Sequence, residues 1–573
     1  MAKVNGTAGN DFIHVKGDGE SASHGYVNIN KATSGADTIN IGQGGNDTVF
    51  AGDGDDIIAG GAAITAADQL NGQGGNDTLK LEGDYSAGLT FGATSLVSID
   101  KITLAKGFSY NLTLNNANTT VNGATFTVDG TALGKSTGMT VDGTAETNAI
   151  LAYYAGAGDD MLKGGMWGNG YELSTGGNDT AIGTAAVDYF FLGGALTAKD
   201  KLSGGGGFGD RLYVDGDYSA GVKFNATTVV DVSTMYIAAG HNYNFTLDDA
   251  TISAGRTMTI DGSLLTAANT LTINDAVEKS AGLTVTAGAG DDVITGGKVS
   301  LVVDLSKGGD DIVIGGAGHE QLFYGATFNA SDSYDGGSGG DDLVILGVVG
   351  SQTLNLTGAM MKNVGTLQMN GGSYTITLQD SVVGAGRAMN IISQGYSGSA
   401  PFVFDGSAET NGMLNVTGGL GSDTLTGGAG NDVLKGVDGK DILTPGGGSD
   451  ILLYGIHGAA ESTSVNYDVI VGFDFDGKDH FDLPGAVTGI DAKLASGTLS
   501  TASFDTDLAA RVTAAKLAAG HAVLFTPDHG TLAGHTFLVV DANGTAGYQA
   551  SADFVFELVT SANQSKLDTA DFM

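Results

Sequence analysis

Residues 418–453 read GGLGSDTLT-GGAGNDVLK-GVDGKDILT-PGGGSDILL, four nine-residue units in tandem without a gap. An aspartate takes the sixth place of every unit (Asp423, Asp432, Asp441 and Asp450), and a leucine follows each aspartate by two residues. Glycine crowds the first four places, where it permits positive φ angles and close backbone approach in a tight turn. The last three residues of a unit are too few for anything but a short strand, whose middle residue points inward. Two units therefore predict one flat coil, with a strand on each face and a turn at each edge.

This unit resembles the glycine- and aspartate-rich nonapeptide GGxGxDxUx of RTX proteins, whose repeats form a calcium-binding parallel β-roll. Calcium prefers six to eight oxygen ligands. The resemblance implies that stacked turns supply these oxygens from Asp carboxylates and glycine carbonyls. The competing interpretation is that Gly and Asp merely favour turns. Four copies in strict register favour the calcium repeat over that interpretation.

Units of the same type recur along the chain, beginning with GTAGNDFIH at residues 6–14. The units around Asp210 (GGGGFGDRLY) and Asp342 (DGGSGGDDLVI) are irregular. Fifteen aspartates are the candidate calcium ligands: Asp11, Asp37, Asp47, Asp56, Asp77, Asp160, Asp179, Asp210, Asp292, Asp311, Asp342, Asp423, Asp432, Asp441 and Asp450. Eight glycines are candidate members of the same sites: Gly45, Gly54, Gly158, Gly290, Gly421, Gly430, Gly439 and Gly448. We expect roughly ten to fifteen bound Ca²⁺ ions, since each unit of this type implies a site.

A longer repeat of about 132 residues is superimposed on the nonapeptides. GDYSAGLTF at 83–91 returns as GDYSAGVKF at 216–224, and AGAGDDMLKGG at 155–165 returns as AGAGDDVITGG at 287–297. Each copy opens and closes with a calcium-type unit, and short runs of alternating apolar and polar residues lie between. We interpret these runs as further coils without the metal edge. The predicted fold is all-β, a parallel β-roll or β-solenoid of three modules with a small β-rich capping domain at its C-terminal end.

The predicted organisation has six parts: an N-terminal β-roll (1–69), modules 1 to 3 (70–201, 202–333 and 334–428), a C-terminal β-roll (429–453) and the capping domain (454–573). In the last part, DTDLAARVTAAKLAAG at 505–520 predicts the one helix, ended by Gly520. This region resembles the C-terminal domain of RTX surface proteins exported by type I machines. Their uncleaved signals finish in an acidic residue followed by hydrophobic ones, as Asp571-Phe572-Met573 does.

The charge of the chain restricts the classes of partner that we expect. The 573 residues include 25 Lys and Arg against 64 Asp and Glu, a formal charge of −39, so cations rather than nucleic acid are the natural counterpart. There is no cysteine to form a disulfide. No apolar run approaches the ~18 residues of a membrane helix. The N-terminus lacks the apolar segment of a cleaved signal peptide, so we expect any export to use the C-terminal signal.

A search for catalytic motifs predicts no catalytic residues and no enzyme. His319-Glu320 is followed by Gln321-Leu322-Phe323, which excludes a zinc-protease HExxH helix. There is no P-loop, and the nine histidines show no carboxylate or thiol cluster at ligand spacing.

The function expected from these features is that of a secreted calcium-binding structural protein at the cell surface. Sites of the extracellular type bind calcium with a Kd of about 10⁻⁴ to 10⁻³ M, so they stay empty in cytosol and fill outside. We therefore expect a chain exported unfolded, which folds and self-assembles on Ca²⁺ as a surface-layer or surface-matrix subunit. Expected partners are calcium, further copies of the chain, the type I secretion machinery and, as a candidate, cell-surface polysaccharide. The alternatives are an RTX adhesin or biofilm-matrix binding protein, and a secreted RTX enzyme whose site is unrecognised.

Overall fold

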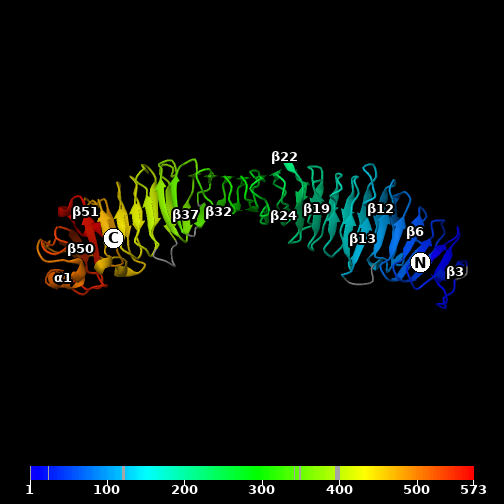
Figure 1. Cartoon of the computed structure of the whole chain (residues 1–573), viewed down its shortest axis with the longest axis horizontal. Coiled ribbons are helices and arrows are strands. Elements are labelled where there is room, and N and C mark those ends of the chain that lie inside the picture. Colours follow the sequence, from blue (N-terminus) through cyan, green and yellow to red (C-terminus); the bar gives the residue numbers. More distant parts are fainter. Residues whose placement is uncertain (1, 23–24, 119–122, 341, 348–349, 394–399) are drawn as a thin grey trace. The chain divides into compact units, whose positions relative to one another are not determined.

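The computed structural model describes all residues except 1, 23–24, 119–122, 341, 348–349 and 394–399. It has two compact units, residues 1–299 and 300–573. Within each unit the strands succeed one another in chain order, as the colours of Figure 1 show.

Unit 1 is built of short parallel strands that alternate between two walls. One wall, in which each strand pairs with the next, holds β1 (Lys3–Asn5), β4 (Thr38–Asn40), β6 (Ile57–Gly61), β8 (Thr78–Leu81), β11 (Lys101–Leu104), β13 (Thr125–Asp129), β15 (Ile150–Tyr154), β17 (Gly170–Glu172), β19 (Tyr189–Gly193), β21 (Arg211–Val214), β24 (Thr234–Ile237), β26 (Thr257–Asp261) and β28 (Gly282–Thr286).

The remaining strands of unit 1 form three parallel groups. The first is β3 (Val27–Ala32), β2 (Asp11–Val15), β5 (Thr48–Asp53), β7 (Gln69–Gly74) and β10 (Leu96–Val97). The second is β9 (Tyr85–Thr90), β12 (Tyr110–Thr113), β14 (Met139–Asp142), β16 (Met161–Lys163), β18 (Thr180–Ile182), β20 (Lys201–Ser203) and β23 (Val229–Val230). The third is β22 (Tyr218–Lys223), β25 (Tyr243–Thr246), β27 (Leu271–Asn274) and β29 (Val293–Thr295).

Unit 2 repeats this plan. Its first wall holds β30 (Ser300–Asp304), β32 (His319–Gly325), β34 (Leu343–Gly347), β37 (Thr366–Asn370), β39 (Ala388–Ser393), β41 (Met413–Thr417), β43 (Val433–Lys435), β45 (Ile451–Leu453) and β47 (His480–Asp482). The other strands are β31 (Ile312–Ile314), β33 (Ser333–Asp335) and β36 (Met361–Lys362), followed by β35 (Ser351–Leu356), β38 (Ser373–Leu378), β40 (Phe402–Asp405), β42 (Thr424–Thr426), β44 (Ile442–Thr444) and β46 (Asp468–Val471).

The nonapeptides fold as their pattern predicts. In β42 to β45 the middle residue is buried and its two neighbours are more exposed. Leu425 pairs with Leu443, and Leu434 pairs with Leu452, so one coil takes 18 residues, or two units. The predicted parallel β-roll is confirmed.

The alternating runs between the nonapeptides are coils of the same stack. Leu112 in β12 pairs with Val141 in β14, which in turn pairs with Leu162 in β16. Leu162 follows the calcium-type aspartate Asp160, so coils of the two kinds lie directly on each other. Buried Val, Ile, Leu and aromatic side chains continue through both kinds of coil.

The C-terminal region closes the stack of unit 2. β46 pairs with β44 and β47 pairs with β45, which adds one coil beyond Leu453. Then β51 (Phe554–Val559) pairs with β46, and the antiparallel strands β50 (Thr536–Val540) and β49 (His521–Phe525) follow, with β48 (Gly489–Ile490) at the edge. Their inward side chains form a separate hydrophobic core with Phe504, Leu508 and Tyr467.

The predicted helix at 505–520 is too long. The only α-helix among the described residues is α1 (Phe504–Arg511). Beyond it, the carbonyls of Val512 and Leu517 accept the N–H groups of Tyr548 and Gly547 in the loop after β50, and only an isolated turn at residues 513–517 remains. Short 3₁₀ turns complete the secondary structure: η1 (Asn116–Asn118), η2 (Gly458–Glu461), η3 (Ser464–Asn466), η4 (Thr501–Ser503), η5 (Gln564–Lys566) and η6 (Thr569–Asp571). No helix in the described part of the chain has the length and apolar character to cross a bilayer.

Candidate metal centre

All fifteen predicted aspartates are buried, none more than 3% exposed. Each stands at the start of a strand or immediately before it, at the end of a turn. Aspartate is almost never fully buried unless it is paired, because its charged form loses hydration. The turns of the stack therefore concentrate negative charge inside the protein, and the contacts of each carboxylate decide what can neutralise it.

One carboxylate oxygen of most of these aspartates joins neighbouring coils. The N–H of Asp423 donates to Oδ1 of Asp441 over 2.8 Å, and the N–H of Asp432 donates to Oδ1 of Asp450 over 2.8 Å. The same bond joins Asp56 to Asp77 over 2.8 Å in unit 1. Hydrogen bonds to a charged acceptor are the stronger kind. They form ladders of carboxylates along the edges of the stack.

The second carboxylate oxygen divides twelve of the fifteen aspartates into two classes. In a closed turn, Oδ2 accepts the N–H of the residue four places earlier, as Asp432 does from Gly428 over 2.5 Å. In an open turn, Oδ2 is buried and, within the described part of the chain, has no hydrogen-bond partner. The closed turns are those of Asp11, Asp37, Asp160, Asp292, Asp423 and Asp432. The open turns are those of Asp56, Asp77, Asp210, Asp342, Asp441 and Asp450.

Backbone conformation explains most of this division. In five open turns the residue four places before the aspartate is left-handed: Gly52 (φ +115°), Gln73 (+69°), Gly206 (+88°), Val437 (+81°) and Gly446 (+104°). The corresponding residue of each closed turn is not left-handed. A left-handed residue turns its N–H away from the carboxylate, so Oδ2 is left for another partner. The turn of Asp342 carries an insertion, and its left-handed glycine, Gly337 (φ +72°), lies five places before.

The electrostatics agree with a site built for a cation. Burial, with the charges of Asp423, Asp438 and Glu461, raises the pKa of Asp441 to about 8. Burial, with the charges of Asp479 and Asp432, raises the pKa of Asp450 to about 7. Each ionised form is thus disfavoured unless a positive charge lies beside it.

These donors fit calcium. Among the described residues, no three His, Cys, Asp or Glu side chains converge on one point. An ion at a turn would therefore be held by one or two carboxylates together with main-chain carbonyls, which are the hard oxygen ligands that Ca²⁺ prefers. Main-chain carbonyls of one coil lie close to the glycines of the next coil, where there is no room for a side chain. A Cβ on Gly439 would lie 2.1 Å from the carbonyl oxygen of Gly421, and one on Gly448 would lie 2.1 Å from that of Gly430. Bound calcium would supply positive charge beside the Oδ2 atoms of the open turns.

Several acids of the ladders are not marked by the nonapeptide pattern. Asp68, Asp200 and Asp332 are buried and accept the N–H groups of Asp47, Asp179 and Asp311. They lack the glycine signature, because Thr65, Thr197 and Asn329 close these turns by donating their N–H groups to Oδ2. The signal was present in their spacing. Each lies 21 residues after a predicted aspartate, and the three recur every 132 residues. Asp188, Asp468 and Asp479 also belong to the ladders.

The recurrent segments DGTAETN (142–148) and DGSAETN (405–411) form turns capped by their own glutamates. Glu409 Oε1 accepts the N–H groups of Asn411 and Gly412, over 3.0 and 2.7 Å. Glu278 does the same in module 2, where it accepts three N–H groups although the sequence there reads NDAVEKS. These buried acids stabilise corners of the coil.

Comparison with known families gives one result. The family described as "RTX calcium-binding nonapeptide repeat" matches the chain over residues 31–63, 65–84, 284–298, 307–329 and 417–452. Ten of the fifteen predicted aspartates lie in these segments, and Asp11, Asp160, Asp179, Asp210 and Asp342 lie outside them. No curated protein matches the chain.

Proposed function

Because the chain carries RTX calcium-binding nonapeptide repeats, we propose that it is a secreted structural protein, folded by calcium outside the cell and assembled as a surface-layer or surface-matrix subunit. The observation that carries this proposal is the ladder of buried carboxylates along the coils of both units. Without cations these charges oppose the stack, and with calcium they hold it together. Cytosolic calcium is too low to fill sites of this type, which couples folding to export.

The export route belongs to the same proposal. A chain that stays unfolded without calcium suits a type I secretion machine. We propose that residues 454–573 carry the uncleaved export signal, and that Asp571-Phe572-Met573 belongs to it. Deleting residues 564–573 should abolish secretion, measured as protein in the medium. Because the deletion also removes the contact of Phe572 with Phe481, circular dichroism of the deleted chain in calcium is the control for folding. Secretion of the deleted chain at the normal level would contradict this role.

Assembly is tested by electron microscopy of the purified chain with 10 mM calcium and after chelation. We expect regular sheets or filaments with calcium and none without it. Monodisperse particles at saturating calcium, over a range of protein concentrations, would contradict a lattice subunit.

A second candidate, a binding protein of the surface matrix, is favoured by a row of aromatic rings in unit 1. Tyr154, Phe191, Tyr213 and Tyr236 occupy one register position on β15, β19, β21 and β24, and Glu172 of β17 stands between the first two. Tyr154 is 43% exposed. The rings of Tyr213 and its two neighbours are stacked, with centroids 4.8 and 4.9 Å apart. Cavities of about 240 and 450 Å³ open along this row.

The partner that fits this row is a neutral polysaccharide. Aromatic rings pack against the C–H faces of sugars, and the nearby carboxylates of Glu172 and Asp215 accept bonds from hydroxyl groups. The charge of −39 opposes polyanionic polymers. We expect a Tyr213→Ala, Tyr236→Ala variant to bind neutral glucans about tenfold more weakly, with Phe108→Ala, an exposed ring outside the row, as control. Unchanged glucan binding, or loss of lattice formation alone, would contradict the polysaccharide role.

The remaining alternative is an enzyme, and we propose that the chain has no catalytic activity of its own. Coils and the C-terminal core account for nearly all the described residues. A turnover detected in a screen of polysaccharide and lipid substrates, and lost in a calcium-free sample, would contradict this.

A further inference from the structure

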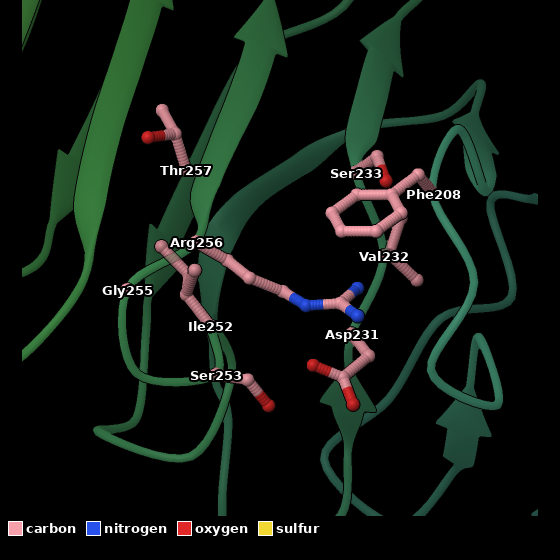
Figure 2. A pocket seen from close by; sticks show the side chains of 9 residues that line it. All are labelled: Phe208, Asp231, Val232, Ser233, Ile252, Ser253, Gly255, Arg256 and Thr257. Atoms are coloured by element: carbon pink, nitrogen blue, oxygen red, sulfur yellow. The ribbon is translucent and has the colours of Figure 1, made fainter.

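The turn of Asp210 already contains a positive charge. The guanidinium of Arg256 donates from Nη1 to the carbonyl oxygen of Gly207 over 2.5 Å, and from Nη2 to that of Gly206 over 2.8 Å. Its Cζ lies 4.4 Å from the centre of the Phe208 ring. Figure 2 shows the side chain reaching across to this turn from the segment before β26. The main-chain oxygens of the turn, which calcium would need, are thus bound to an arginine.

The position of Arg256 is not occupied by the same residue type in all three modules. Strand register aligns Thr127, Thr259 and Asn390, since they pair with Lys101, Thr234 and Thr366 of the preceding coils. Three residues earlier stand Ala124 in module 1, Arg256 in module 2 and Arg387 in module 3. The arginine is therefore present where the calcium-type unit is irregular, and absent where the unit, GQGGNDTLK around Asp77, is regular.

A second position changes together with the first. In module 1, Asp100 accepts the N–H of Asp77 over 2.7 Å and extends the ladder by one acid. The equivalent residues are Ser233 in module 2, whose Oγ accepts the N–H of Gly209, and Gly365 in module 3. Two residues earlier stand Ser98 in module 1, Asp231 in module 2 and Asn363 in module 3, all left-handed. Module 2 therefore moves the carboxylate by two residues, beside Arg256, whereas module 3 has none at either position. With the added guanidinium, the local charge rises by one in module 2 and by two in module 3.

Module 3 has the same arrangement in part. Arg387 Nη1 donates to Oδ1 of Asn363 over 3.0 Å. A Cβ on Gly340, in the turn of Asp342, would lie 3.0 Å from Arg387 Nη2, so the guanidinium lies directly against that turn. In module 2 the charge of Arg256 acts on Asp210, and Asp231 lines the same cavity as the guanidinium. The Oδ2 atoms of Asp210 and Asp342 are buried in these turns.

We propose that Arg256 and Arg387 are resident cations that take the place of calcium at the turns of Asp210 and Asp342. These two turns are then calcium-independent, whereas the equivalent turn of Asp77 binds the ion. The segments that match the RTX repeat agree with this division, since 65–84 includes Asp77 and no matched segment includes Asp210 or Asp342. The proposal rests on calcium binding at the regular turns and adds which turns do without it.

The test exchanges these three positions between modules in the full chain. Asp231→Ser and Ser233→Asp with Arg256→Ala restores the module 1 arrangement in module 2 and should add one bound calcium per chain. Ser98→Asp and Asp100→Ser with Ala124→Arg does the reverse in module 1 and should remove one. Bound calcium is counted by elemental analysis after equilibrium dialysis, and circular dichroism at saturating calcium shows which variants fold.

A second measurement does not depend on the variants folding. Density from crystals or cryo-EM of the wild-type chain in calcium should show an ion at the turn of Asp77 and none at Asp210 or Asp342. An ion at either of the last two turns would overturn the inference, as would folded exchange variants whose calcium content is unchanged. A wild-type chain that binds no calcium anywhere would overturn the proposed function as well, so the two failures are distinguishable.

Discussion

The two oxygens of a buried aspartate do separate work in this protein. Oδ1 of Asp441 accepts the N–H of Asp423, and this bond joins two coils. Oδ2 of the same residue has no hydrogen-bond partner among the described residues, so it is the atom that needs a cation. Asp432 differs, because Leu414 and Gly428 donate N–H groups to its two oxygens. The nonapeptide thus contains carboxylates for structure and carboxylates for metal under one consensus.

Asparagine should separate these two kinds of aspartate. In Asp441→Asn the amide oxygen keeps the bond from Asp423, and only the partnerless charged oxygen is lost. We expect weaker stabilisation by calcium, by about 1.4 kcal/mol at ten times Kd, and no loss of stability in chelator. In Asp432→Asn the amide NH₂ would face an N–H donor, which leaves a buried group unsatisfied at a cost of about 1–3 kcal/mol with or without calcium. Thermal unfolding of both variants in calcium and in chelator measures the difference, and equal responses to calcium would refute the two classes.

A variant of Asp200 tests the role of a buried acid that lies outside the glycine-rich nonapeptides. The oxygens of Asp200 accept the N–H groups of Asp179 and Thr197, over 2.8 and 2.6 Å. Asp200→Ala leaves both donors without these acceptors and should cost about 2 kcal/mol or more. Lys199→Ala changes an exposed side chain in the same turn and should cost less than about 0.5 kcal/mol. Hydrogen exchange of the amides in β18 and β20 measures the loss of stability in both variants. Equal protection in the two variants would contradict a stabilising role for Asp200.

At the scale of the element, the nine-residue unit could be predicted almost completely from sequence. A strand of three residues has one inward position, so Leu425 and its equivalents had to be buried. The buried acids outside the nonapeptide pattern, such as Asp200, could not be predicted from the residues next to them. Asp200 depends on Thr197 for its turn and on a spacing visible only across modules. Arg256 contacts a turn about 50 residues earlier, a distance set by two full coils. The helix prediction failed after Arg511 because the carbonyl of Val512 is bonded to Tyr548, a tertiary contact that helix propensity does not contain.

Two glycines of neighbouring units test how tightly coils pack. Gly439 has φ +138°, and a Cβ there would lie 2.1 Å from the carbonyl oxygen of Gly421. Gly447 is not left-handed, and the nearest atom to its Cβ would be 3.9 Å away. We expect Gly439→Ala to destabilise the coil by about 2 kcal/mol or more, and Gly447→Ala to be neutral or slightly stabilising. Thermal unfolding at fixed calcium compares them, and a neutral Gly439→Ala would show that the coils can move apart there.

At the scale of the whole molecule, the formal charge of −39 has to be reconciled with fifteen predicted and buried aspartates. Protons, calcium and arginine are three ways to do so. Arginine is fixed in the sequence, which restricts it to a few turns such as that of Asp210. Protons and calcium compete for the other carboxylates, because a metal ligand has to be deprotonated. The stability of the stack should therefore depend on pH in opposite ways with and without calcium.

Without calcium, acid should stabilise the fold. Burial raises the pKa of Asp56 and Asp423 from 3.8 to about 6, that of Asp450 to about 7 and that of Asp441 to about 8. Between pH 4 and 8 the folded chain therefore holds more protons than the unfolded chain, whose aspartates keep a pKa near 3.8. Folding takes up protons, so this contribution is complete below pH 3.8 and is lost as the pH rises through 6 to 8.

The measurement is far-UV circular dichroism of the full chain, stripped of calcium on a chelating resin, at pH 5, 6, 7 and 8 and constant ionic strength. We expect a largely unfolded chain at pH 8 and more β structure at pH 5. In calcium titrations the order reverses, and the midpoint should move to higher calcium as the pH falls, because the ion has to displace protons. A stripped chain that is fully folded at pH 8, or a calcium midpoint independent of pH, would mean that the buried carboxylates are neutralised by something other than the ion.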